Sequence, residues 1–351
     1  MTIDLSERPL ASTLGSRPPS LRSGEARRPG SAGATARRQP TGSVRRGVLA
    51  LFPGQGSQVA GMGRRAVETS PAAAEFFDAA SRALGRDLRQ LCWNSPRETL
   101  TETANAQVAL TAASIADWLA LREKEAGTAD DAGDAGLGHD ACSGHSVGAL
   151  AAAVAAGFLS PVDGLRLAAA RGELMAQAPA GGSMLALATP LAAADEDELM
   201  AQAHSLAQEH GVEVAALNGP RQFVLAGGKA QLEAVAQRYG AASKMLQVSN
   251  AFHSRYMEPV APRWRETVHK VDFKPGRRRY VGCTTAQLTT EADDVRADLI
   301  RGLTEPVRWF GVLERTGDLA QIDVFGPGQA IARLTRSHLG GRPLRIHGGG
   351  R

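Results

Sequence analysis

The sequence predicts an α/β fold in which a large domain, built on a parallel sheet, is interrupted by a small inserted subdomain. Apolar runs typical of buried strands alternate with helical patterns over residues 48–177 and again over 322–338, which favours a mostly parallel sheet covered by helices on both faces. Residues 183–250 follow the order βαββαβ, the split-βαβ or ferredoxin-like unit. The chain has 351 residues, of which 43% are hydrophobic, so both units can bury a core.

These patterns divide the chain into three parts. We expect residues 46–180 and 251–345 to form a discontinuous large catalytic domain, and residues 181–250 to form the ferredoxin-like subdomain. Residues 1–45 are rich in Arg, Ser, Gly and Pro and have no hydrophobic periodicity, so we expect a disordered extension. A transit peptide and a mis-called start codon are the alternatives for this segment.

Turn residues and apolar runs set the order of elements in the large domain. A short apolar run at 48–52 ends in the turn sequence PGQG, and another at 141–144 leads to Ser146, so each predicts a buried strand. Residues 125–139 are small, acidic and rich in glycine, and predict a surface loop. A last strand is predicted at 322–325. Helical patterns lie at 67–84, 104–123, 147–158, 161–177, 259–268 and 329–338.

In the subdomain, the sequence NGP at 218–220 is a turn signal that separates two central strands. The predicted strands lie at 184–188, 212–217, 222–226 and 244–249, and the predicted helices at 193–210 and 229–240. Each helix therefore follows a strand and precedes the next one, as a split-βαβ unit requires.

Charge and cysteine content exclude several classes of function. The net charge is +4, but residues 1–46 hold nine Arg and three acidic residues, which leaves −2 for the remainder, so the folded part is not expected to bind nucleic acid. No apolar run approaches ~18 uninterrupted residues, so we expect no membrane span. Cys92, Cys142 and Cys283 are too few and scattered for a disulfide framework or a zinc site, and predict reduced thiols in a cytoplasmic protein.

The sequence GHSVG at 144–148 fits the nucleophile elbow G-x-S-x-G, because a short strand precedes it and a helical pattern follows. The elbow makes the predicted large domain α/β-hydrolase-like. It would hold Ser146 at a helix N-terminus, where free N–H groups favour a developing negative charge. An ordinary Gly/Ser turn is the alternative interpretation of this pattern.

A serine nucleophile needs a base, and His253 is the best candidate of the eight histidines. It follows the last strand of the subdomain, where the chain returns to the large domain and can reach the end of the parallel sheet. A structural histidine is the alternative.

Five motifs in a fixed order carry a family resemblance. They are FPGQGSQ at 52–58, GHSVG at 144–148, RGELM at 171–175, FHS at 252–254 and GPG at 326–328. The region that carries these motifs, about residues 47–340, resembles the malonyl-CoA:acyl carrier protein transacylases and the acyltransferase domains of polyketide and fatty acid synthases. The ordered series, with a ferredoxin-like insert between the third and fourth motifs, is far more specific than any one motif.

The resemblance implies roles at the matching positions. Ser146 would be the nucleophile and His253 its general base. The backbone amides of Gln55 and Val147 would stabilise the oxyanion. Arg171 would bind the free carboxylate of a malonyl group in a bidentate fork.

Three further residues have implied roles. The backbone carbonyl of Gly302 would orient the catalytic histidine, since it lies a few residues before the motif PVRW at 306–309. Asn218 would lie near the substrate pocket. Phe252 resembles the malonyl-type enzymes, because a bulky wall beside the histidine disfavours an α-methyl branch by about 1–3 kcal/mol.

The resemblance implies a ping-pong transfer of malonyl from malonyl-CoA, through a seryl ester, to the phosphopantetheine thiol of an acyl carrier protein, in fatty acid or polyketide synthesis. No bound cofactor or metal is expected, since the partner carries the phosphopantetheine. We expect a monomer or a member of a multienzyme system. Carrier proteins are usually acidic, and one candidate basic rim is Lys274, Arg277, Arg278 and Arg279, although an ordinary solvated charge run has the same pattern.

One departure leaves the pathway open. The family commonly has Glu directly after G-H-S-x-G, where this chain has Ala149. The run that starts at Ser146 is similar to the epsilon subunit of malonate decarboxylase, which performs the same transfer. An alternative of another class is a serine esterase or thioesterase with the same elbow, but it would leave Arg171 unexplained. A non-catalytic scaffold is a third possibility, against which the intact Ser146 and His253 argue.

Overall fold

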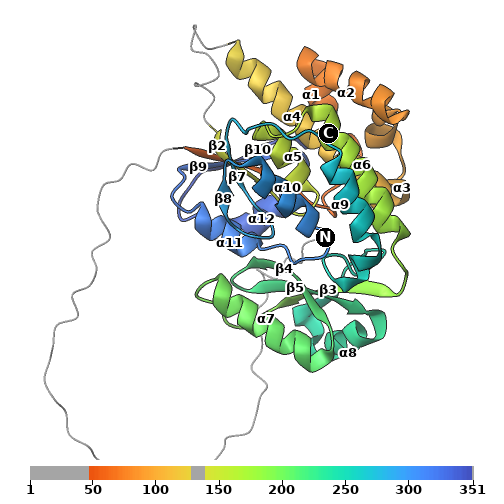
Figure 1. Cartoon of the computed structure of the whole chain (residues 1–351). Coiled ribbons are helices and arrows are strands. Elements are labelled where there is room, and N and C mark those ends of the chain that lie inside the picture. The colour runs from red at the N-terminus through yellow and green to blue at the C-terminus, as the bar shows by residue number, and fades with distance from the viewer. Residues whose placement is uncertain (1–46, 128–138, 350–351) are drawn as a thin grey trace, which may run out of the picture.

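The computed structural model describes residues 47–127 and 139–349 (Figure 1). The predicted extension at 1–45 and most of the predicted loop at 125–139 lie outside the described residues. Within them the chain is an α/β protein with two separate sheets.

The larger sheet has six strands in the order β10-β9-β1-β2-β7-β8. All neighbours are parallel except β7 and β8, which are antiparallel. At its centre Phe52 of β1 lies opposite Gly144 of β2, so the loops that follow these two strands start side by side at the carboxyl edge. The strands are β1 (Val48–Phe52), β2 (His139–Gly144), β7 (Arg279–Val281), β8 (Leu288–Thr289), β9 (Gln321–Phe325) and β10 (Leu344–His347).

Helices cover this sheet, and the first half of the long helix α4 lies in the core. Its residues from Thr103 to Ala116 are almost all buried, and it packs against α2, α5 and α6. The helix α6 begins where its sequence predicts, because Ser160 Oγ accepts a hydrogen bond from Asp163 N and Pro161 occupies the first position. The helices are α1 (Arg64–Thr69), α2 (Pro71–Leu84), α3 (Arg97–Thr101), α4 (Thr103–Ala126), α5 (Gly148–Ala155), α6 (Pro161–Gln177), α9 (Ala261–His269), α10 (Ala292–Arg301), α11 (Trp309–Arg315) and α12 (Gln329–Arg336).

The smaller sheet is antiparallel, has the order β4-β5-β3-β6, and has its own hydrophobic core. Its two helices cover the face turned away from the large domain (Figure 1). The elements are β3 (Gly182–Ala188), α7 (Glu196–His210), β4 (Glu213–Gly219), β5 (Gln222–Gly228), α8 (Lys229–Tyr239) and β6 (Ser243–Met245). Along the chain they follow the order βαββαβ.

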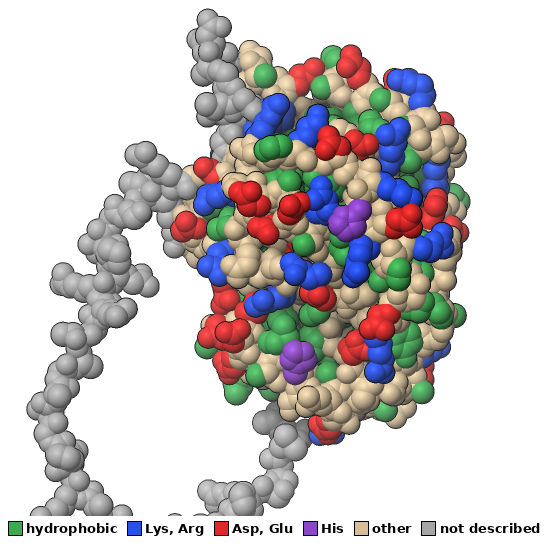
Figure 2. All heavy atoms as spheres, viewed as in Figure 1, with side chains coloured by type: hydrophobic (Ala, Val, Ile, Leu, Met, Phe, Trp, Pro, Cys, Tyr) green, Lys and Arg blue, Asp and Glu red, His purple; other side chains and the backbone are tan. Residues whose placement is uncertain are grey.

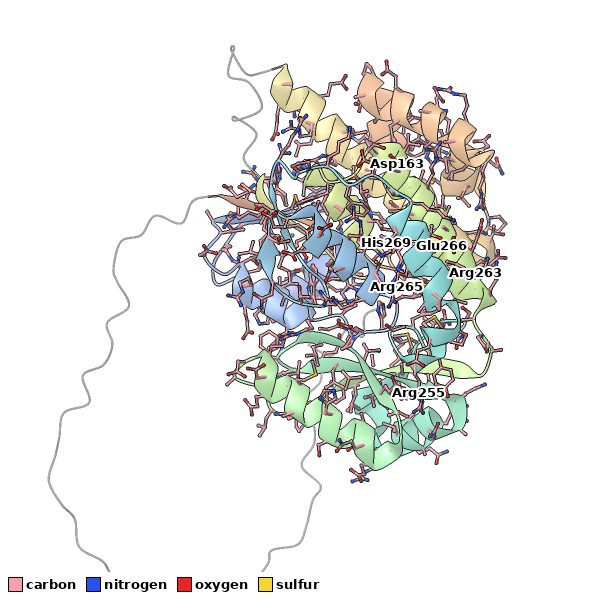
Figure 3. All side chains as sticks on the ribbon, viewed as in Figure 1. Asp163, Arg255, Arg263, Arg265, Glu266 and His269 are labelled. Carbon is pink, nitrogen blue, oxygen red and sulfur yellow. The ribbon has the colours of Figure 1, made fainter. Side chains whose placement is uncertain are left out.

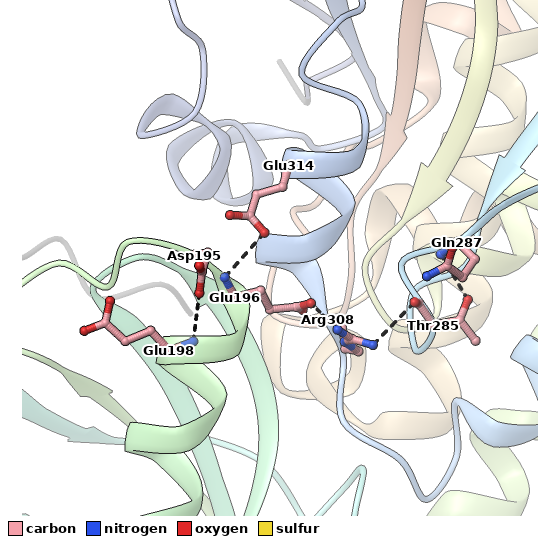
Figure 4. Close-up of polar contacts among 7 residues, drawn as sticks. All are labelled: Asp195, Glu196, Glu198, Thr285, Gln287, Arg308 and Glu314. Atoms are coloured by element: carbon pink, nitrogen blue, oxygen red, sulfur yellow. Dashed lines mark hydrogen bonds and ion pairs between the residues drawn. The ribbon is translucent and has the colours of Figure 1, made fainter. Parts of the chain in front are cut away.

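The small sheet is joined to the large domain through the segment around Val307. Main-chain hydrogen bonds run from Leu217 N to Val307 O at 2.8 Å and from Val307 N to Ala215 O at 2.9 Å. Beside them, Glu196 at the start of α7 forms an ion pair with Arg308 (Figure 4). The small subdomain is therefore fixed at this side of the large domain by backbone and side-chain contacts.

Candidate active site

Ser146 stands on a sharp turn between β2 and α5. Its backbone has φ 53°, one of three positive φ values at non-glycine residues in the described part of the chain. Such a conformation is strained for a residue with a side chain and is typical of functional sites. The turn needs Gly144, because a Cβ there would come within 2.1 Å of the backbone of Gly148. The geometry is that of the predicted nucleophile elbow.

His253 meets Ser146 from the segment that leads back from the small subdomain. The two side chains are joined by a hydrogen bond of 2.8 Å between Ser146 Oγ and His253 Nε2. His253 also has a positive φ, 59°. Its segment is anchored by Asn250, whose Nδ2 donates to the carbonyl of Pro179 at 2.9 Å, and by Ser254, whose Oγ donates to the carbonyl of Ala251 at 2.7 Å.

The surroundings keep His253 neutral. Burial lowers the pKa of His253 to about 3, and the positive charge of Arg171 and the neighbouring His145 act in the same direction. The backbone carbonyls of Glu305 and Gly302 act in the opposite direction and raise the pKa. A neutral imidazole can accept the proton of a serine hydroxyl, so the histidine is ready to act as a base.

Arg171 is a buried cation beside the serine. The side chain of this α6 residue is 3% exposed, and its Nη2 lies 3.4 Å from Ser146 Oγ. Nη2 also donates to the carbonyl of Gly302 at 2.9 Å, and Nη1 donates to Gln107 Oε1 at 3.0 Å. Burial lowers the pKa of Arg171 to about 10, so the guanidinium remains charged at neutral pH. No carboxylate of the described residues forms an ion pair with it.

The loop after β1 packs directly against the elbow. A Cβ at Gly54 would come within 2.7 Å of the carbonyl oxygen of His145, and His145 N donates to the carbonyl of Phe52 at 2.9 Å. Gln55 and Val147 therefore lie on adjoining loops. Within the described ranges, neither backbone amide donates a hydrogen bond, which leaves both available for an oxyanion.

Asn218 contacts the elbow through His145, and its expected place near the substrate pocket stays a prediction. Its Oδ1 and His145 Nε2 are 3.0 Å apart, so the end of β4 in the small subdomain supports the residue next to the nucleophile. The ring of His145 also lies 5.6 Å from that of Trp309. Phe252 is 4% exposed and precedes the catalytic histidine.

The carbonyl of Gly302 acts on both Arg171 and His253. It accepts a hydrogen bond from Arg171 Nη2, and together with the carbonyl of Glu305 it raises the pKa of His253. His253 Nδ1 makes no hydrogen bond of regular geometry with the described residues, so the orienting role expected of Gly302 stays a prediction. The end of α10 thus acts on both the guanidinium and the imidazole.

Two site residues were not predicted from the sequence. Gln107 of α4 is 1% exposed and holds Arg171, while its Nε2 donates to Met175 Sδ at 3.0 Å. Asp298 of α10 is 2% exposed. It lines a small cavity of about 10 Å³ together with Ser146, Arg171 and Cys283, about the room for one water molecule. Gln107 lies in a predicted helical pattern, Asp298 lies in a segment for which no helix was predicted, and no motif marks either residue.

The basic run at 277–279 lies away from this site. Arg279 starts β7 and pairs with Ala141 of the parallel strand β2, whereas Ser146 follows the other end of β2. The candidate rim is therefore at the amino edge of the sheet, opposite the nucleophile. On the face that carries α9, positive and negative side chains alternate (Figure 2), and Arg263, Arg265 and Glu266 project outward from this helix (Figure 3).

Residues 50–313 match the family described as acyl transferase domain. The malonyl CoA-acyl carrier protein transacylase of Bacillus subtilis (strain 168) is 35% identical over 299 residues, covering 82% of this chain and 89% of that protein. The phenolphthiocerol synthesis polyketide synthase Pks15/1 of Mycobacterium marinum is 37% identical over 247 residues, covering 68% of this chain but 11% of that protein. A solved complex of a type II PKS acyl-carrier protein with its malonyl-transacylase (PlMCAT:AntF) matches with a TM-score of 0.74 and 29% identity, covering 86% of this chain and 95% of that one.

No group of three or more His, Cys, Asp or Glu side chains in the described part of the chain could hold a metal ion. No helix in residues 47–127 or 139–349 is long and apolar enough to cross a membrane.

Proposed function

The chain belongs to the acyl transferase domain family, and on this basis we propose that it moves a malonyl group from malonyl-CoA to the phosphopantetheine thiol of an acyl carrier protein. The transfer serves fatty acid or polyketide synthesis. Ser146, His253 and Arg171 are the residues to which we assign the chemistry.

In the first half-reaction, Ser146 Oγ attacks the thioester carbonyl of malonyl-CoA while its proton passes to His253 Nε2. The tetrahedral oxyanion accepts hydrogen bonds from the amides of Gln55 and Val147. Collapse of this intermediate breaks the C–S bond, and the CoA sulfur leaves with the proton from His253. The product is a malonyl ester on Ser146.

In the second half-reaction, the thiol of phosphopantetheine gives its proton to His253 and attacks the malonyl-seryl ester. The bond between the acyl carbon and Ser146 Oγ breaks, and the oxygen takes the proton back from His253. Free enzyme and malonyl-acyl carrier protein result, so one histidine serves as base and acid in both halves.

The substrate assignment depends on one observation: Arg171 is buried and has no carboxylate partner among the described residues. A buried guanidinium without an acidic partner is costly, and here its Nη2 lies 3.4 Å from the nucleophile. Only an acyl group with a terminal carboxylate would bring the missing negative charge to this position. A dicarboxylic thioester such as malonyl-CoA therefore fits the site better than acetyl-CoA.

A serine esterase fits less well. Such an enzyme orients its histidine with an acidic side chain, and no described carboxylate makes a hydrogen bond with His253 Nδ1. An esterase of neutral substrates would also gain nothing from a buried Arg171.

Malonyl loading tests the proposal. Wild-type protein mixed with malonyl-CoA should gain the mass of one malonyl group, and a holo acyl carrier protein should then remove it and become malonylated. Ser146→Ala should gain no mass, while Ser95→Ala, outside the elbow, should behave as wild type. Sustained CoA release without a carrier protein would establish hydrolysis and overturn the transfer assignment.

We propose that the protein acts in the cytoplasm. Cys92, Cys142 and Cys283 are buried free thiols, in keeping with a reducing compartment.

A further inference from the structure

Asp298 is a buried carboxylate at the active site that the transfer chemistry does not use. It lies in the last turn of α10 and lines the same small cavity as Ser146 and Arg171. Ala149 lines this cavity too and contributes no polar side-chain atom. Asp298 is the one acidic side chain among the described residues that line the cavity, so its position there requires a physical explanation.

Four hydrogen bonds occupy the carboxylate. Oδ1 accepts from Thr284 N at 2.9 Å and from Thr284 Oγ1 at 2.6 Å. Oδ2 accepts from Cys283 N at 3.1 Å and from Tyr280 OH at 2.8 Å. With all four acceptor sites filled, Asp298 has no lone pair left for substrate. All its donors belong to β7 and the loop that follows, so the carboxylate ties α10 to the end of the central sheet.

The same turn of α10 sets the position of a carbonyl that Arg171 needs. Gly302 N donates to the backbone carbonyl of Asp298 at 2.8 Å, and the carbonyl of Gly302 accepts the hydrogen bond from Arg171 Nη2 at 2.9 Å. Trp264 Nε1 fixes the same turn by donating to the carbonyl of Leu299 at 2.9 Å. A shift of this turn would therefore move one of the protein groups that orient the guanidinium.

We propose that Asp298 is a positioning residue for recognition of the acyl carboxylate. It anchors the last turn of α10 to the loop after β7, and thereby places the Gly302 carbonyl that aims Arg171 at the substrate. The inference rests on the proposed function, because it assumes that Arg171 binds the malonyl carboxylate. Hydrogen bonds to a charged acceptor are stronger than those to a neutral one, which explains why a carboxylate suits this anchor.

The selectivity of a variant for malonyl-CoA over other acylating reagents shows whether Asp298 positions Arg171 or only supports the fold. Asp298→Asn keeps the size of the side chain but turns acceptor sites into donors that face other donors. We expect it to lower kcat/KM for malonyl-CoA about tenfold or more. The rates with acetyl-CoA and with a fluorophosphonate that labels Ser146 should change much less. Thr284→Val removes one of the four hydrogen bonds and should act in the same direction, more weakly. Asp293→Asn, at a side chain of α10 that is 91% exposed, is the matched control and should behave as wild type.

A double-mutant cycle with Arg171→Ala decides the route of the effect. If Asp298 acts through Arg171, Asp298→Asn should lower malonyl loading no further in the Arg171→Ala background. Equal losses with malonyl-CoA, acetyl-CoA and the fluorophosphonate, or additive losses in the cycle, would overturn the inference. Thr284→Val carries the same comparison if Asp298→Asn does not fold. Failure of the proposed function is distinguishable, since wild-type protein would then show no malonyl loading at all.

Discussion

Gln107 Oε1 accepts a hydrogen bond of 3.0 Å from Arg171 Nη1 in the interior of the protein. The contact joins α4 to α6 directly behind the nucleophile, and it leaves the guanidinium fully charged because an amide is neutral. Together with the Gly302 carbonyl on Nη2, it fixes the plane of the fork. The orientation of the cation is thus set before substrate binds, as a preorganised anion site requires.

Replacing Arg171 should remove the preference for a carboxylated acyl group. Arg171→Ala should remove about 2–4 kcal/mol of transition-state stabilisation with malonyl-CoA, which lowers kcat/KM about 30- to 1000-fold. Loading with acetyl-CoA should be nearly unchanged. Arg171→Lys should recover part of the loss, since it restores charge without the fork. The measurement is single-turnover acylation of Ser146 with each thioester. Equal use of acetyl-CoA and malonyl-CoA by the wild type would refute the clamp.

Gln107→Glu should weaken binding of malonyl-CoA, although the two side chains have nearly the same size. The new carboxylate would lie against Arg171 and neutralise the charge that the substrate needs. We expect a rise in KM for malonyl-CoA of about tenfold or more, with little change in thermal stability. Gln90→Glu, a surface change, is the control. An unchanged KM in Gln107→Glu would show that the charge of Arg171 is not what binds malonyl-CoA.

The acid limb of the acylation rate should lie far below the ordinary histidine range. His253 must be neutral to act as a base, and its pKa is lowered to about 3, so it stays competent as the pH falls through 6.5. Arg171→Ala removes one positive neighbour and should move the limb to higher pH. Fluorophosphonate labelling of Ser146 between pH 4 and 8 should show an almost constant rate in the wild type, and any decline toward pH 4 should be larger in Arg171→Ala. A midpoint between pH 6 and 7 in the wild type would contradict this environment.

The α4 residue Asp117 should destabilise the fold at neutral and alkaline pH. Burial raises its pKa to about 7 from 3.8, while the backbone of Gly326 acts in the opposite direction. The folded protein then binds more protons than the unfolded chain between pH 3.8 and 7, so this group makes stability fall as the pH rises through that window. Asp117→Asn removes the slope and should add about 1–3 kcal/mol above pH 7.

Thermal unfolding at pH 5 and pH 8 checks the Asp117 prediction. The gain from Asp117→Asn should be larger at pH 8, and the exposed Asp272→Asn should show no difference. A gain of equal size at both values would mean that the buried charge is not its cause.

Phe252 should limit the size of the acyl group. It is buried directly before His253, so Phe252→Leu should raise the use of methylmalonyl-CoA relative to malonyl-CoA by about 1 kcal/mol, or about fivefold. Competition between the two thioesters, read by the mass of the acyl-enzyme, gives the ratio. An unchanged ratio in a folded variant would place the α-carbon away from this side chain.

The sequence predicted the residues that stand in motifs, and missed those that act through tertiary packing. Ser146, His253 and Arg171 meet in the structure because each motif follows a strand or lies on a helix that the apolar pattern predicts. Gln107 looks like an ordinary helix residue, and Asp298 belongs to α10, a helix that was not predicted. Only the packing of α4, α6 and α10 brings the two residues to the site. The sequence indicated the carbonyl of Gly302 as a partner of His253 but not its hydrogen bond with Arg171, because a carbonyl can accept from more than one donor.

The fold was predictable to a similar degree. Long strands and helices with clear periodicity, such as β1, β3 and α6, lie close to where they were expected. The strands β7, β8 and β10 were not predicted, because two to four residues are too few for a pattern. The helical pattern at 67–84 is two helices, since Ser70 and Pro71 end α1 and start α2. Strand β6 ends at Met245 rather than 249.

The main-chain hydrogen bonds that pair Val307 with Ala215 and Leu217 oppose separation of the small subdomain from the large domain. Any separation of the small subdomain that began at this seam would break them, as well as the ion pair between Glu196 and Arg308. The small subdomain and the segment that leads into α11 are therefore held together at this point, so the position of one depends on the position of the other.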